Sequence, residues 1–125
     1  MFASLAYGLA ALLIALVLVI GARFLLSPQA AAAGYGVPAR PEGDPAYLTI
    51  KGLRDFTSGL IGLALLAFAD ADALAWFMLA VAVTPLGDTW IVLRHGGTKA
   101  TAFGIHFATA VMVVLSAALL FVSGS

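Results

Sequence analysis

The chain has 125 residues, of which 63% are hydrophobic and 10% are charged, and its mean hydropathy is +1.11. A soluble domain is roughly 45–50% apolar and about 25% charged, and a chain this short cannot bury so much apolar surface in water. The composition therefore predicts an integral membrane protein. The net charge is zero with no basic run, which argues against a nucleic-acid partner, and the absence of cysteine excludes disulfides and thiolate metal sites within the chain.

The first apolar stretch covers residues 4–26, and about 20 apolar helical residues are enough to cross a bilayer core. A cleavable signal peptide is a rival interpretation, but such a peptide begins with basic residues and has a shorter apolar run. Residues 28–44 follow as a linker rich in Pro and Gly. The Ala-rich start of this linker is compatible with a helical turn at the membrane interface.

A second span is expected over residues 46–69, although its uncharged part begins only at Phe56. That part is roughly 21 Å long at 1.5 Å per residue, which is short of the hydrocarbon core of about 30 Å. We therefore expect Lys51, Arg54 and Asp55 to enter the membrane with their charges facing protein.

Asp72 is expected to cap a third span that ends at residue 94, and Thr98 to cap a fourth span over residues 99–122. Pro85 predicts a kink in the third span, because proline removes a backbone hydrogen bond. The fold class predicted is all-α: an integral membrane four-helix bundle, antiparallel and up-down-up-down, forming a single transmembrane domain over residues 1–125.

The basic residues all lie at or near two of the connections, 27–45 and 95–98. They are Arg23, Arg40, Lys51, Arg54, Arg94 and Lys99. Cytoplasmic loops are enriched in Lys and Arg. This asymmetry predicts a multi-pass protein of the inner or plasma membrane with these two connections in the cytoplasm and both termini outside.

Polar and small residues of the second span share one helical face. They are Tyr47, Lys51, Arg54, Asp55, Ser58, Gly59 and Gly62. The third span contributes Thr84 and Asp88, and the fourth contributes His106. Asp88 and His106 lie six or seven residues from the nearest helix end, which places each about 9–10 Å deep. Ionisable residues from three spans are therefore expected in one layer near the inner leaflet.

An arginine in this layer needs an acidic partner, since a central Arg costs about 2.5–3.5 kcal/mol on insertion scales and does not shed its proton. Asp55 and Asp88 are the candidate partners, and we expect an Arg54–Asp88 ion pair between helices. The candidate catalytic residues are Asp88, Asp55 and His106, and the candidate ligand-binding residues are Arg54, Tyr47, Thr84 and Ser58. Neither an HxxxH nor an ExxH spacing is present, so no metal and no cofactor is expected.

Four segments of the chain, GARFLLSPQAAAAGYGVP, KGLRDFTSGLIGLAL, PLGDTWIVLRHGG and GIHFATA, resemble a known family. It is family 4267 of the domains of unknown function, short four-span membrane proteins found in bacteria and in fungal biosynthetic clusters. Gly52-Leu53-Arg54-Asp55 and Gly87-Asp88 are the sharpest elements, and His106 fits the family's usual histidine. The resemblance implies a four-helix membrane fold and no established activity.

The polar layer leaves three functions open. The first is binding or turnover of a lipophilic small molecule by proton transfer, as in an isomerase or cyclase, with Arg54 orienting the ligand and His106 relaying a proton. The second is a transport or channel subunit. The third is a structural membrane protein in which the cluster locks the helices together. The expected partners are the lipid bilayer and a lipophilic ligand, and a homo-oligomer is left open.

Overall fold

The computed structural model describes residues 2–36 and 45–124, and within these ranges it is helical without a strand. The helices are α1 (Phe2–Leu26), α2 (Pro28–Tyr35), α3 (Ala46–Phe68), α4 (Ala71–Val81), α5 (Val83–Arg94), α6 (Lys99–Thr101), the π-helix η1 (Ala102–Phe107) and α7 (Ala108–Gly124). The prediction of an all-helical protein is confirmed.

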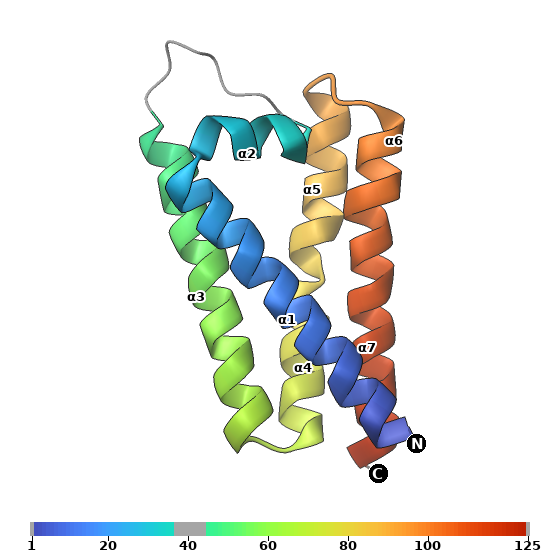
Figure 1. The fold of residues 1–125 in the computed structure, drawn as a ribbon. Helices are drawn as coiled ribbons and strands as arrows, with labels where there is room; N and C mark the ends of the chain where they lie inside the picture. Colours follow the sequence, from blue (N-terminus) through green and yellow to red (C-terminus); the bar gives the residue numbers. More distant parts are fainter. Residues whose placement is uncertain (1, 37–44, 125) are drawn as a thin grey trace.

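Figure 1 shows α1 running obliquely across the other long segments. It packs along α3 and, near its N-terminal end, against α7, while α4 packs on α7 and α5 on η1. The short helix α2 lies across one end of the molecule, and both chain ends lie at the other (Figure 1). Helix α1 therefore connects α3 to the remaining helices.

Three helical segments are long and apolar enough to cross a membrane: Phe2–Leu26, Ala71–Arg94 and Lys99–Gly124. By length and composition this is a membrane protein. Helix α3 has 23 residues but is not one of the three, because Lys51, Arg54 and Asp55 interrupt its apolar sequence. A fourth span and the antiparallel four-helix arrangement remain predictions.

Helices α1 and α3 approach each other through glycine. A Cβ atom added at Gly52 would lie 2.8 Å from the Gly21 carbonyl oxygen and 2.8 Å from the Leu25 backbone nitrogen. Further along α3, Gly59 and Gly62 are buried against side chains of α1. Gly59 and Gly62 belong to the face of α3 on which the sequence places small residues, and small residues let a neighbouring helix approach closely.

The apolar core lies toward the end that holds the chain termini. It is formed by small and aliphatic residues of α1, α4 and α7, among them Ala6, Ala10, Ile14, Leu74, Met78, Val113 and Leu120. Alanines let these helices pack closely where no hydrophobic effect drives association between spans. The polar residues gather toward the opposite end, beside α2.

The third long segment is interrupted at Ala82, one turn before Pro85, where α4 ends and α5 begins. Pro85 has no N–H group and cannot bond to the carbonyl of Val81, which explains a break at this place. The backbone N–H of Leu86 restores the ladder by donating to the Ala82 carbonyl at 3.3 Å. The kink itself remains a prediction.

The N-terminal cap of α4 was predicted two residues too late. Asp70, and not Asp72, is the capping residue, since its Oδ1 accepts from the Ala73 backbone N–H at 2.8 Å. Asp72 lies in the first turn, where its charge suits the helix dipole. The predicted cap at Thr98 is confirmed by its Oγ1, which accepts from the Thr101 N–H at 3.1 Å.

The predicted linker 28–44 begins as helix α2. Pro28 occupies the first turn, where a missing N–H group costs nothing, and α2 ends at Gly36 in the left-handed conformation with φ 103°. A Cβ atom at Gly36 would lie 2.7 Å from Cγ2 of Thr101, so the end of α2 is pressed against α6. Tyr35, the last residue of α2, thereby lies between α1, α5 and η1. Residues 37–44 lie outside the described residues.

Candidate functional site

A cavity of about 340 Å³ lies between α1, α2, α3, α4, α5 and the η1–α7 segment. Its walls are mostly aliphatic and aromatic. The polar residues that line it are Arg23, Tyr35, Asp55, Ser58, Thr84, Asp88, His106 and Thr109. Five predicted site residues are thus brought to one cavity: Asp55, Ser58, Thr84, Asp88 and His106. Their catalytic and binding roles stay predictions.

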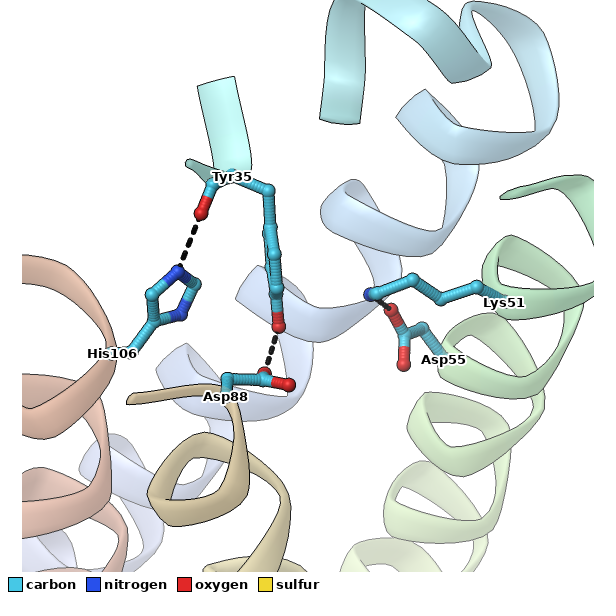
Figure 2. A network of polar contacts seen from close by, with 5 residues as sticks. All are labelled: Tyr35, Lys51, Asp55, Asp88 and His106. Carbon is cyan, nitrogen blue, oxygen red and sulfur yellow. Dashed lines mark hydrogen bonds and ion pairs between the residues drawn. The ribbon is translucent and has the colours of Figure 1, made fainter. Parts of the chain in front are cut away.

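Tyr35 connects the polar residues of this cavity to one another. Its hydroxyl donates a hydrogen bond to Oδ2 of Asp88, and its backbone carbonyl accepts one from Nε2 of His106 at 2.7 Å (Figure 2). The Tyr35 ring lies 4.3 Å from the His106 ring and 5.5 Å from the Phe24 ring, between centroids. One side chain of α2 therefore contacts α1, α5 and η1.

Lys51 faces the same cluster from α3. Its Nζ lies 2.5 Å from Oδ2 of Asp55, one turn further along the helix. The same atom lies 4.2 Å from the centroid of the Phe24 ring and 4.2 Å from that of Tyr35. The Lys51 and Asp55 side chains are 30% and 17% exposed. Lys51 is thus turned inward, onto two aromatic faces, in line with the expectation that its charge faces protein.

The Tyr35 hydroxyl is held in its protonated form. Burial, and next the neighbouring carboxylate of Asp88, raises the pKa of this phenol above its ordinary value of about 10. The more distant Asp55 acts in the same direction. At neutral pH Tyr35 is therefore a hydrogen-bond donor toward Asp88, in keeping with the geometry.

His106 is 3% exposed and lies in the π-helix η1. Short π segments inside α-helices are rare and frequently occur at functional sites. Because a carbonyl oxygen only accepts, Nε2 of His106 carries the hydrogen that binds the Tyr35 carbonyl. In the neutral ring Nδ1 is then an acceptor. His106 thus positions Tyr35 through the backbone, and the proton relay expected of it stays a prediction.

The predicted Arg54–Asp88 ion pair is wrong. The Arg54 side chain is exposed and does not line the cavity, and Asp88 accepts its hydrogen bond from Tyr35. Adjacent helical residues point about 100° apart, so a helix that turns Asp55 into the cavity turns Arg54 out of it. Lys51, one turn before Asp55, supplies the cation on the inner face.

Tyr47 is also misplaced by the sequence prediction. Its side chain is 82% exposed, and it does not line the cavity. It lies in the first turn of α3, where the adjacent Leu48 is the residue that packs on α1 and α2. Tyr35, which the prediction of site residues omitted, supplies a phenol at the site.

The family model described as Domain of unknown function (DUF4267) matches residues 14–120. This range contains all the polar residues that line the cavity. No curated protein and no solved structure matches the chain. Since the matched range covers most of the sequence, the chain belongs to the DUF4267 family.

Proposed function

We propose that this protein binds a lipophilic small molecule in the cavity and acts on it by proton transfer at Asp88. The observation that carries the proposal is the combination of an apolar-walled space of about 340 Å³ with a polar end formed by Tyr35, Asp88 and Asp55. Ligand pockets typically have volumes of about 300–1,000 Å³, mostly apolar walls and a few placed polar groups.

The proposed chemistry needs no group from outside the chain. Asp88 is the acid or base, and the Tyr35 phenol, hydrogen-bonded to one of its oxygens, supports it. Ser58 and Thr84 offer hydroxyl groups to a polar atom of the ligand. Isomerisation or cyclisation suits this set, since each requires only a proton moved between positioned atoms. Asp55, engaged by Lys51, is assigned to holding the site together.

Ligand retention tests the binding part of the proposal. Ser58 lines the cavity, whereas its neighbour Thr57 is exposed on the same helix, so Ser58→Phe fills the space and Thr57→Phe is the matched control. Purified protein is extracted with organic solvent and analysed by mass spectrometry. We expect one lipophilic compound with the wild type and Thr57→Phe, and about tenfold less with Ser58→Phe at equal folded yield. Equal amounts in all three proteins would contradict a ligand in this cavity.

Isotope exchange tests the proton-transfer part. The retained compound is incubated with protein in deuterium oxide, and its deuterium content is followed by mass spectrometry. The wild type is expected to accelerate exchange at one C–H position, and Asp88→Asn to lose this acceleration while remaining folded, because an amide does not exchange a proton as a carboxyl group does. Exchange that is unaffected by Asp88→Asn would remove Asp88 from the chemistry.

We also propose that α3 crosses the membrane as a fourth antiparallel span of a single domain, with the α2 end in the cytoplasm. The termini lie at the opposite end (Figure 1), and the basic residues of α1, α3, α5 and α6 lie toward α2. The partly buried Lys51 is paired with Asp55, which lowers the cost of placing this part of α3 in the membrane.

Cysteine labelling tests this orientation directly, because the natural chain contains no cysteine. His95 and Asp72 are both exposed, at opposite ends of the α4–α5 segment. A membrane-impermeant maleimide added to intact cells is expected to label Asp72→Cys and to spare His95→Cys until the cells are opened. The reverse pattern would invert the proposed topology.

A second candidate is a helix lock that binds no ligand. It is favoured by the contacts of Tyr35, which joins α1, α5 and η1. For a lock, Asp88→Asn lowers the unfolding midpoint and Ser58→Phe, by filling an empty space, raises it. Solvent extraction then yields no compound that depends on the cavity. Those results would replace the binding proposal with the structural one.

A further inference from the structure

Asp88 presents a carboxylate to the cavity without a basic partner. Within residues 2–36 and 45–124, no Lys or Arg side chain forms an ion pair with it. Its donor, the Tyr35 hydroxyl, is neutral and binds Oδ2. In Figure 2 the other carboxylate oxygen of Asp88 is turned toward the side on which Lys51 and Asp55 lie. This oxygen remains available to a molecule in the cavity.

Neither cation near the cavity, Lys51 or Arg23, forms an ion pair with Asp88. Lys51 is neutralised by Asp55 at 2.5 Å and covered by two aromatic rings. Arg23 lines the cavity, but its side chain is exposed near the end of α1, where a long side chain reaches headgroups and water. The carboxylate left without a matching charge in the cavity is therefore that of Asp88.

The surroundings of Asp88 favour a cationic guest. An unpaired carboxylate in apolar surroundings is costly, and a charged hydrogen bond to an ammonium group is about twice as strong as a neutral one. The remaining walls, which include Leu13, Val17 and Phe77, suit an alkyl body.

We infer that the cavity takes a lipophilic amine, whose protonated nitrogen binds Asp88 and whose alkyl body lies against the apolar walls. The inference rests on the proposed function and specifies the class of its ligand. It sets the cavity apart from one built for fatty acids, because a carboxylate ligand placed against Asp88 would meet a like charge.

Three probes with the same ten-carbon chain test the inference: decylamine, decanol and decanoate. Each is titrated into the protein in non-ionic detergent at pH 7, and the thermal unfolding midpoint is followed, since a ligand of the folded state raises it. The proteins are wild type, Asp88→Asn and Asp72→Asn, the last removing the same charge from an exposed position on α4. Comparing proteins at one probe concentration cancels the partitioning of the probe into micelles.

The wild type and Asp72→Asn are expected to bind decylamine at least about tenfold more tightly than decanol, and Asp88→Asn to lose that preference. Decanoate is expected to be the weakest of the three. Equal binding of decanol and decylamine by the wild type would overturn the inferred class while leaving the cavity a ligand site. If no probe shifts the wild type, the inference fails, and ligand retention by the Ser58→Phe variant decides the proposed function separately. Should Asp88→Asn not fold, the wild-type order of the three probes still decides the inference.

Discussion

Gly21→Ala is expected to destabilise the protein by about 1–3 kcal/mol, the usual cost of overpacking a tight contact. A Cβ atom at Gly21 would lie 2.5 Å from the backbone nitrogen of Phe56, 2.8 Å from the Gly52 carbonyl oxygen and 2.9 Å from Cα of Phe56. All three atoms belong to the backbone of α3, so no side chain can rotate away and α3 itself has to move. Thermal unfolding in detergent measures the loss.

Gly8→Ala is the matched control for this change. Gly8 lies on the same helix, and a Cβ atom there has no neighbour within 4 Å. Alanine is a better helix former than glycine by about 1 kcal/mol, so this variant is expected to be as stable as the wild type or more so. A Gly21→Ala protein as stable as Gly8→Ala would mean that α1 and α3 are not in backbone contact.

Tyr35→Ala is expected to cost about 3–5 kcal/mol of folding stability, the range for removing a large aromatic side chain from a packed site. The change removes the ring that packs against Phe24 and His106 and covers Lys51. Tyr35→Phe removes only the hydroxyl, leaves Asp88 without its donor and is expected to cost about 1–3 kcal/mol. The unfolding midpoint is therefore expected to be highest in the wild type, lower in Tyr35→Phe and lowest in Tyr35→Ala.

The rate at which an introduced cysteine reacts shows whether the stability lost in Tyr35→Ala comes from undocking of α2. Ala31 is 4% exposed and Ala30 is exposed on the same helix, so Ala31→Cys reports the docking of α2 and Ala30→Cys serves as the reference. A soluble maleimide is expected to react with Ala31→Cys much faster in the Tyr35→Ala background than in the Tyr35→Phe background. Unchanged protection in Tyr35→Ala would show that α2 is held by other contacts.

The fold could be predicted from the sequence to the extent that it depends on local patterns. Long apolar runs, the proline and glycine of the linker and the cap at Thr98 specify helices and their ends, and the helices of the structure follow them. The glycine face of α3 was visible as a helical periodicity. These features are set by residues within one or two turns of each other, which the sequence displays directly.

Five of the residues that line the cavity were predicted as site residues, but their pairing was not. Asp55, Asp88 and His106 were placed at one depth by counting residues from helix ends, and they do line one cavity. The choice between Lys51 and Arg54 as the inner cation depends on the rotation of α3 about its axis. That rotation is set by Gly52 meeting Gly21, a contact between helices that no local pattern contains.

Tyr35 was missed for a similar reason. It stands between two glycines at the end of an alanine-rich stretch, and this pattern predicts a linker. Its role arises because α2 is helical and Gly36 presses the end of that helix against α6, so the phenol enters between segments far apart in the sequence. A bulky polar aromatic residue isolated among small residues is the sequence feature that would have pointed to it.

The π turn at Ala102–Phe107 has a consequence for the register of the last helix. A π turn accommodates one residue more than an α turn, so the faces before and after it are set independently. His106 faces the Tyr35 carbonyl, while Val113 and Leu120 still face the apolar core. In a chain one residue shorter here, a regular helix could satisfy one of these orientations only. The wide turn is therefore the adjustment that lets one continuous segment serve both the polar cluster and the packing of the opposite end.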